Sequence, residues 1–272
     1  MRKVAVIMCV YCQDDAAQLK EAVNSILGQT HNETDLFIYR DGLVHPALED
    51  YLIASEGFDS RISVYRSNSN HGLAYGLNFL IAKVLAKSEC QFIARMDSDD
   101  VSRNKRISKQ VVFFERNPEI DVCGTACREF GTEFAKPEKR LPETHAELVK
   151  FSMTRCPFVH PTVMFRISVF QEGNRYPTDT SLTEDMALWF LLLKNGYRFA
   201  NINEILLDYR LTEGTLARRK GFSKALSEIK IRLKNMQALN QTNTKNVLLV
   251  LGRIGFHMLP AWALKLAYRY IR

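Results

Sequence analysis

The sequence predicts an α/β protein: a doubly wound, mostly parallel sheet followed by a helical, basic and amphipathic C-terminal appendage. Strand-like and helix-like segments alternate three times over the first hundred residues, as in sheets with helices on both faces. The strand-like segments are short, continuous apolar runs, typical of parallel strands covered on both sides. Basic residues gather late: residues 215–272 hold 12 Lys or Arg and one acid (+11), which leaves 25 basic and 29 acidic residues (−4) before them.

The first hundred residues contain four predicted strands and three predicted helices. The strands are Val4–Tyr11, Leu36–Tyr39, Ile62–Tyr65 and Phe92–Met96; the helices are Ala16–Leu27, a short one around Leu48–Leu52, and Leu73–Leu85. The N-terminus has two basic residues and a short apolar run but no small-residue cleavage site. We therefore interpret it as a buried strand and not as a signal peptide.

The second half is less regular. Predicted helices cover Ile107–Phe114, Glu143–Met153, Glu184–Leu193 and Phe222–Leu239; predicted strands cover Ile120–Cys123, Tyr197–Ile202 and Ile205–Leu211, with Pro157–Phe165 extended around His160. Among six cysteines, Cys9 and Cys12 form one C-x-x-C pattern with no second copy. Free buried thiols in a reducing compartment are the simpler interpretation, and a zinc or redox site is the alternative.

Three carboxylates, Asp97, Asp99 and Asp100, follow the fourth strand directly. Ligands of open parallel sheets bind beyond the carboxyl ends of the strands, so the segments after Tyr11, Tyr39 and Met96 should line one crevice. Crowded carboxylates repel one another unless a cation neutralises them, and their hard oxygens suit Mg²⁺ or Mn²⁺. The alternative is that these acids cap the helix that contains Ile107.

Other polar residues have both a structural and a functional interpretation. Asp41-Gly42 ends a strand, where the carboxylate could accept from a nucleoside or simply form a turn. Glu184 and Asp185 open a helix, so they could compensate its dipole, or Asp185 could act as a general base held rigidly above Trp189. His160 is either structural or a ligand contact.

Several segments together resemble family-2 glycosyltransferases. They are VIMCVYCQDDAAQLKEAVNSILGQTH, FIYRDG, NHGLAYGLN, ARMDSDDVSRNKRISKQ, HPTVMFR and LTEDMALWFLLLKNGYRFANINEILLDYR, which occur in the family's order over roughly residues 3–212. The resemblance is strongest to bacterial enzymes that build O-antigen and exopolysaccharide repeat units.

The resemblance implies a GT-A fold, an Mn²⁺ or Mg²⁺ cofactor and inversion at the anomeric carbon of the transferred sugar. Residues 1–100 would bind the nucleotide, and residues 101–214 would bind the acceptor. The implied roles are uridine binding by Tyr11 and Asp41, nucleotide contact by Asp97, metal binding by Asp99 and proton abstraction by Asp185. Arg210 is a candidate for phosphate contact, and Glu184 and His160 are candidates for acceptor or phosphate contact. Cys12, Arg40 and Thr212 depart from the family's usual Asn, Asp and His at these positions.

The C-terminal segment, residues 247–272, is apolar but interrupted by Arg253, Lys265, Arg269 and Arg272, with Pro260 in its middle. It lacks the roughly 20 uninterrupted apolar residues that a membrane-spanning helix requires. Apolar, basic and aromatic residues together favour a helix lying in an anionic headgroup layer. The alternative is a helical hairpin packed on the catalytic domain. No motif or aromatic-interleaved basic groove indicates nucleic acid as a partner.

The combined prediction is an inverting glycosyltransferase that moves a hexose from a UDP-sugar to a lipid-linked, polyprenyl-diphosphate glycan. It would be cytoplasmic and peripheral on the inner face of the cell membrane, and would serve surface polysaccharide assembly. A nucleotidyltransferase is the alternative enzyme, although VYCQDD is not the Gly-rich, Lys- or Arg-bearing loop that such enzymes usually place after the first strand. A catalytically inactive, membrane-associated binding protein is the alternative of another class.

Overall fold

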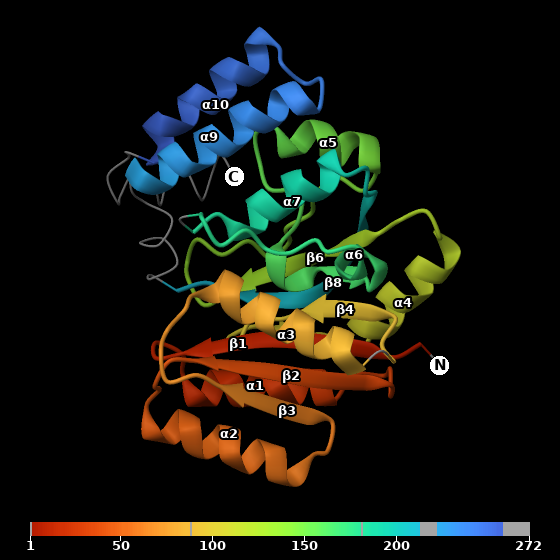
Figure 1. The fold of residues 1–272 in the computed structure, drawn as a ribbon, viewed down its shortest axis with the longest axis vertical. Coiled ribbons are helices and arrows are strands. Elements are labelled where there is room, and N and C mark those ends of the chain that lie inside the picture. The colour runs from red at the N-terminus through yellow and green to blue at the C-terminus, as the bar shows by residue number, and fades with distance from the viewer. Residues whose placement is uncertain (1, 88, 181, 213–221, 258–272) are drawn as a thin grey trace.

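The computed structural model describes residues 2–87, 89–180, 182–212 and 222–257. Within this part of the chain one sheet runs through the molecule, with helices on both of its faces (Figure 1). Its strand order is β3 (Ile62–Arg66), β2 (Thr34–Asp41), β1 (Val4–Tyr11), β4 (Phe92–Arg95), β7 (Met164–Arg166), β6 (Val122–Phe130), β8 (Phe199–Arg210) and β5 (Val101–Ser102).

The first four strands are parallel, as predicted from the alternation of strands and helices. The central strand β1 shows why its sequence is continuously apolar. Val4, Val6, Met8 and Val10 face one core, whereas Ala5 and Ile7 face the other, and all six are fully buried. Beyond β4 the sheet becomes mixed, because β7 is antiparallel to both β4 and β6.

Helices divide between the two faces of the sheet. The hydrophobic residues of α1 (Ala16–Leu27), α2 (Pro46–Phe58) and α4 (Arg106–Arg116) pack into one core. Those of α3 (Leu73–Lys87), α5 (His145–Ser152), α6 (Ser168–Gln171) and α7 (Glu184–Lys194) pack into the other, as the front position of α3 in Figure 1 illustrates. In the helix predicted at Ala16–Leu27, the apolar residues at helical spacing are Leu19, Ala22, Val23, Ile26 and Leu27; the first four are buried and Leu27 is partly buried.

The second half differs from the sequence prediction in three places. The two strands predicted at 197–202 and 205–211 form one strand, β8, because pairing with β6 resumes beyond a bulge at Asn203 and Glu204. The segment predicted to be extended around His160 contains a 3-10 turn, η1 (His160–Thr162), which Pro161 favours through its fixed φ. The strand predicted at 120–123 extends to Phe130.

In its described part, the C-terminal appendage forms two helices, α9 (Phe222–Ala238) and α10 (Thr244–His257), which lie side by side next to α5 and α7 (Figure 1). Ile229, Met236 and Val250 bury themselves against Met153, Met186 and Phe190. The described part of the appendage therefore supports the packed-hairpin alternative.

No helix in the described ranges is long and apolar enough to cross a bilayer. Residues 258–272, and with them most of the predicted membrane-binding segment, lie outside these ranges, as does the predicted domain boundary at residue 214.

All six cysteines are free thiols. Cys9 lies in β1 with its sulfur facing α3, whereas Cys12 is exposed just beyond the strand. Among the described residues, the acidic cluster is the only group of three or more His, Cys, Asp or Glu side chains placed to share a metal ion. The zinc interpretation of the C-x-x-C pattern therefore gains no support.

Close packing of α3 against the sheet gives a test of the fold. A Cβ at Gly76 would lie 2.7 Å from Tyr39 Cδ1 and 2.8 Å from Cys9 Sγ, so Gly76→Ala should lower the free energy of unfolding by about 1–3 kcal/mol. Gly57→Ala is the matched control, because nothing lies within 4 Å of a Cβ there and helical alanine should stabilise α2 by up to about 1 kcal/mol. Urea denaturation measures both; equal effects would contradict the predicted close contact.

Candidate active site

The acidic cluster lies where the order of the parallel strands reverses. β1 has β2 on one side and β4 on the other, and Tyr11 is paired with Asp41 at the shared carboxyl edge. Asp97, Asp99 and Asp100 follow β4 at this same edge. The three segments predicted to line one crevice therefore meet at the switch point, where doubly wound sheets bind ligands.

The three carboxylates converge on one point. One oxygen from each of Asp97, Asp99 and Asp100 lies within 4.8 Å of the others. Asp100 is fully buried, and its Oδ1 accepts a hydrogen bond from the backbone N–H of Arg210 (2.7 Å). Its Oδ2 is buried and has no hydrogen-bond partner among the residues that the structure describes. Burial, together with the negative charges of Asp97 and Asp99, raises the pKa of Asp100 well above its usual range.

The cluster does not cap the following helix. The helix α4 begins at Arg106, its N-cap residue is Lys105, and no side chain caps it. No acidic residue lies in its first turn. The capping interpretation is therefore wrong, and the position of these acids needs another explanation.

Two buried arginines supply counter-charge from opposite faces of the sheet. Arg95 pairs with Asp97 on the face covered by α3 and α7. Arg106 reaches the end of β4 from α4, donating to the carbonyl of Arg95 (2.7 Å) and contacting the sulfur of Met96 (3.3 Å). Burial lowers the pKa of Arg106 to about 9, and the charge of Asp100 opposes that shift.

Asp14 is a fourth acid that sequence reasoning missed. Asp15 caps α1, accepting from the N–H groups of Ala17 and Gln18, which leaves Asp14 to accept from Tyr11 N–H (2.9 Å) beside Ser98. Burial raises the pKa of Asp14 to about 7, with additional contributions from Asp99 and Asp97. The available signal was its place three residues beyond Tyr11, at the same sheet edge as the cluster.

Asp41 lies at the end of β2 with its carboxylate engaged by backbone. Its two oxygens accept from the N–H groups of His71 (2.7 Å) and Gly72 (2.8 Å), so it holds the loop before α3 against the sheet. This arrangement agrees with the turn interpretation, and Asp41 is also paired with Tyr11 at the carboxyl edge of the sheet. Arg40, where the family often has Asp, points elsewhere: it pairs with Glu49 (3.1 Å) and donates to the carbonyl of Gly42 (2.8 Å).

Arg210 links the end of β8 to the acidic cluster. Its Nε donates to the carbonyl of Asp99 (2.7 Å), and its terminal nitrogen pairs with Glu21 of α1 (2.5 Å). The guanidinium also lies 4.5 Å from the ring centre of Phe130. The predicted phosphate-contacting residue is therefore next to the predicted metal ligand, although 111 residues separate the two in sequence.

His160 contacts the hydroxyl of Tyr176, and Glu184 and Asp185 lie near enough for their charges to help raise the pKa of Tyr176. Glu184 and Asp185 form the first turn of α7, and Asp185 Oδ1 accepts from the N–H of Met186 (2.7 Å). Trp189, one turn further on, is fully buried against Phe158 and Phe165, as expected for a rigid support. His160 shares a hydrogen bond with the hydroxyl of Tyr176 (2.9 Å).

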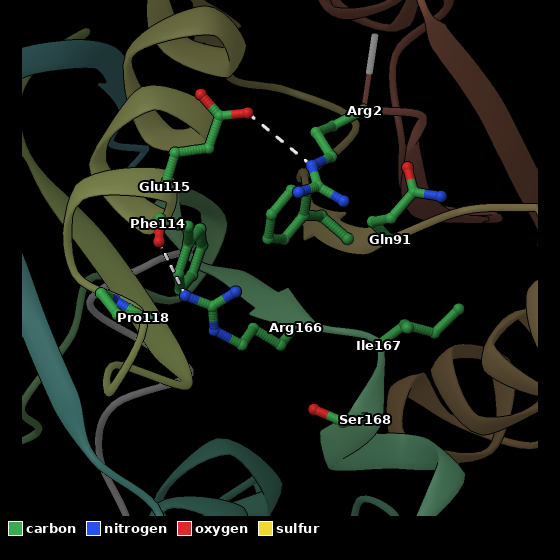
Figure 2. A pocket seen from close by; sticks show the side chains of 9 residues that line it. Arg2, Gln91, Phe114, Glu115, Pro118, Arg166, Ile167 and Ser168 are labelled. Carbon is green, nitrogen blue, oxygen red and sulfur yellow. Dashed lines mark hydrogen bonds and ion pairs between the residues drawn. The ribbon is translucent and has the colours of Figure 1, made fainter.

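A pocket of about 320 Å³ lies elsewhere, beside the first residues of β4 (Figure 2). Its arginines are already engaged: Arg166 donates to the carbonyls of Phe114, Asn117 and Ile120, and Arg2 pairs with Glu115 (3.7 Å). None of the predicted site residues lines it. The carboxyl edge of the sheet at the acidic cluster is therefore the better candidate for an active site.

The donor set of the cluster fits a divalent metal ion. Carboxylate oxygens within 4.8 Å of one another can share one cation, and the unpartnered Oδ2 of Asp100 lacks the positive or donor group that a buried carboxylate needs. Asp99, half-buried, and Asp100 would hold such an ion, with Asp97 and its partner Arg95 beside them.

Comparison with known proteins identifies the family of this chain. Residues 5–174 match the family described as Glycosyl transferase family 2. A UDP-Gal:alpha-D-GlcNAc-diphosphoundecaprenol beta-1,3-galactosyltransferase of Escherichia coli is 30% identical over 95% of this chain and 92% of its own. The O-antigen biosynthesis glycosyltransferase WbnJ of Escherichia coli is 31% identical over 76% and 79%, respectively.

Two solved structures share the GT-A fold. The chain covers 72% of S. aureus TarS 1–349 in complex with UDP-GlcNAc, with a TM-score of 0.66 over 94% of this chain and 14% identity. It covers 83% of the Pyrobaculum calidifontis mannosyltransferase PcManGT, in complex with GDP-Man and Mn²⁺, with a TM-score of 0.60 over 99% of this chain and 15% identity. At these identities the likeness concerns the fold.

Metal binding at the cluster is testable without an activity assay. Mn²⁺ at tenfold excess over its Kd should stabilise the wild type by about 1.4 kcal/mol, or a rise in Tm of about 2–4 °C. Asp99→Asn should lose this shift, and in EDTA its Tm should equal or exceed that of the wild type because like-charge repulsion falls. Asp50→Asn, on the exposed side of α2, is the control and should keep the shift. An undiminished Mn²⁺ shift in Asp99→Asn would show that the metal binds elsewhere.

Proposed function

This chain belongs to glycosyltransferase family 2, and from that premise we propose that it transfers a hexose from a UDP-sugar to a lipid-linked, polyprenyl-diphosphate glycan with inversion. The observation that carries the proposal is the convergence of Asp97, Asp99 and Asp100 at the switch point beside Tyr11 and Asp41. The names of the Escherichia coli relatives support a lipid-diphosphate acceptor and a role in surface polysaccharide assembly.

The donor would bind along the carboxyl edge of the parallel strands. Tyr11 and Asp41, adjacent at the ends of β1 and β2, would hold the uridine, with Asp97 next to the nucleotide. Arg210, already beside the carbonyl of Asp99, would reach the diphosphate by exchanging its exposed partner Glu21 for phosphate oxygens. A guanidinium fork suits phosphate, and it could replace the His that the family often has at the position of Thr212.

Asp99, with Asp100 beside it, would hold Mn²⁺ or Mg²⁺. When bound, such an ion neutralises charge on a diphosphate leaving group. The chain's own contribution is to fix these carboxylates: Asp100 is held by the backbone of Arg210, and Asp97 by the guanidinium of Arg95. Buried donors and counter-charges of this kind need no rearrangement during the reaction.

Asp185 would take the proton from the acceptor hydroxyl. It lies in the first turn of α7, whose remaining residues are anchored by the buried Trp189, so its backbone is held firmly. A hydroxyl is a weak nucleophile at neutral pH and needs such a base. Glu184 is its neighbour in that turn and would contact the acceptor or replace Asp185 if the latter is not the base.

The acceptor would meet residues 101–214 and the membrane would meet the appendage, residues 215–272. Leu248, Leu249 and Leu251 on α10 are 63%, 49% and 43% exposed, and the appendage carries 12 basic residues against one acid. Exposed apolar and basic groups together favour the surface of an anionic bilayer. We therefore propose a peripheral position on the inner face of the cell membrane.

Family membership outweighs the nucleotidyltransferase alternative, and a direct assay tests the inactive-protein alternative. The assay presents a panel of UDP-sugars and a synthetic lipid-diphosphate acceptor with Mn²⁺, and reads products by mass spectrometry. Transfer to the acceptor supports the proposal. Neither transfer nor hydrolysis of any donor, from protein that binds UDP, would favour an inactive binding protein.

The base can be tested with Asp185→Asn. The variant should bind UDP-sugar with near-normal affinity while kcat falls by roughly 10²–10⁴-fold, as for a lost general base. Asp179→Asn, which removes an exposed acid from the segment before α7, is the control and should stay near the wild type. If Asp185→Asn turns over within a factor of three of the wild type, the base lies elsewhere and Glu184→Gln is the next variant.

Membrane docking can be tested without disturbing the buried side of the hairpin. Leu248→Gln combined with Leu251→Gln removes exposed apolar groups and leaves the buried Val250 in place. The fraction of this variant that sediments with anionic vesicles should fall severalfold. Its KM for a long-chain acceptor should rise, and its affinity for UDP-sugar should not change. Binding of the wild type should weaken with salt, since its electrostatic part is screened.

The matched control for docking is Ile53→Gln with Phe58→Gln. These side chains are 57% and 60% exposed on α2, at the opposite end of the molecule from α10 (Figure 1). The control loses similar apolar surface but should still bind vesicles. Equal binding by both double variants and the wild type would contradict docking through α10.

A further inference from the structure

A run of hydrogen bonds connects α3 to the segment that precedes α7. The side-chain amide of Asn78 pairs with the backbone of Tyr176 in both directions: Asn78 Nδ2 donates to the carbonyl (2.8 Å), and Tyr176 N–H donates to Asn78 Oδ1 (2.9 Å). Asn78 thus uses both ends of its amide on one residue 98 positions away. This pairing fixes the backbone position of Tyr176, from which its side chain extends.

The hydroxyl of Tyr176 extends this series of hydrogen bonds towards α7. Tyr176 is buried, and its hydroxyl shares a hydrogen bond with Nε2 of His160 (2.9 Å). The His160 ring lies edge-on to Trp189, with ring centres 5.9 Å apart. Trp189 is four residues after Asp185, so the two side chains lie on one side of α7, one turn apart. His160 therefore packs against α7 one turn after Asp185 and on the same side of the helix.

Electrostatics agree with this location. Burial raises the pKa of Tyr176; the charge of Arg95 opposes the shift, and those of Asp185 and Glu184 add to it. The hydroxyl thus lies within the field of the acids of α7 while remaining protonated. Burial lowers the pKa of His160 well below its usual range, and Arg95 lowers it further, so the imidazole is neutral. A hydrogen bond between two neutral groups persists throughout the neutral pH range.

We propose that Tyr176 and His160, anchored by Asn78, form a positioning pair that fixes the Asp185 carboxylate relative to the acidic cluster. The inference rests on the proposed function, in which Asp185 is the base. It assigns His160 a supporting role in place of the substrate contact expected from the sequence, because Nε2 is occupied by Tyr176. Neither residue of the pair needs to touch donor, acceptor or metal.

Tyr176→Phe tests the pair by removing a single hydroxyl. We expect kcat to fall about tenfold, since small displacements of a catalytic group are costly, while the donor KM and the Mn²⁺ midpoint stay within twofold. Tyr197→Phe is the control: this buried residue also loses a hydrogen-bonded hydroxyl, whose partners Asn174 and Glu172 lie away from Asp185. It should lose similar thermal stability and keep its kcat.

Substitutions at His160 provide a rescue. His160→Gln keeps a polar partner for the Tyr176 hydroxyl and should retain more activity than His160→Leu. The double variant Tyr176→Phe, His160→Leu should be no slower than its slower parent, because both changes break one interaction. Additive losses would contradict a shared role.

Asp185→Asn separates this inference from the proposed function. If the wild type is active, Asp185→Asn is inactive and Tyr176→Phe turns over normally, the positioning role is wrong and the base assignment stands. If Asp185→Asn is active, the base assignment fails and the positioning role fails with it. Loss of stability in Tyr176→Phe without loss of kcat would show a purely structural pair.

Discussion

Crowding of carboxylates at the carboxyl end of β4 is the constraint on which the rest of the structure depends. Two unit charges 4.8 Å apart repel by about 3.5 kcal/mol at an effective dielectric of about 20, and Asp14 adds a fourth acid beside the three. The fold offsets this repulsion with buried cations on both faces of the sheet, Arg95 and Arg106. These cations explain how an acid cluster can fold before any ligand arrives.

The same cluster joins the two halves of the sheet. The short strand β5 follows Asp100 directly and pairs with β8 at the far edge of the sheet, so the chain crosses from the parallel half at this point. Arg210, at the end of β8, returns to bind Asp99 and Asp100 through its side chain and backbone. The geometry of the cluster is therefore set by both halves, and neither half alone contains the site.

Local patterns made much of this architecture predictable. The apolar runs predicted the parallel strands, and apolar residues at helical spacing predicted the buried faces of α1, α3 and α7. Both patterns are visible in the sequence because they depend only on residues close together in the chain. The bulge that keeps β8 continuous was not predictable, since it depends on pairing with β6. Asp14 was missed for a related reason: Asp14 and Asp15 look alike in sequence, and only the helix geometry decides that Asp15 caps while Asp14 turns to the cluster.

The described helices of the C-terminal appendage, α9 and α10, pack on the catalytic domain on one side and are exposed on the other. Arg232, fully buried on α9, donates to the carbonyl of Ser152 in α5 (2.6 Å), and Met186 and Phe190 of α7 pack against α9. The opposite side of α7 holds Trp189 in the sheet core. Because α7 is fixed between the core and the hairpin, a hairpin bound to a lipid surface would set the distance of Asp185 from that surface. The proposed base and the proposed membrane contact thus belong to one rigid unit. A fixed distance between them suits an acceptor whose reacting hydroxyl is separated from its lipid by a fixed number of sugars.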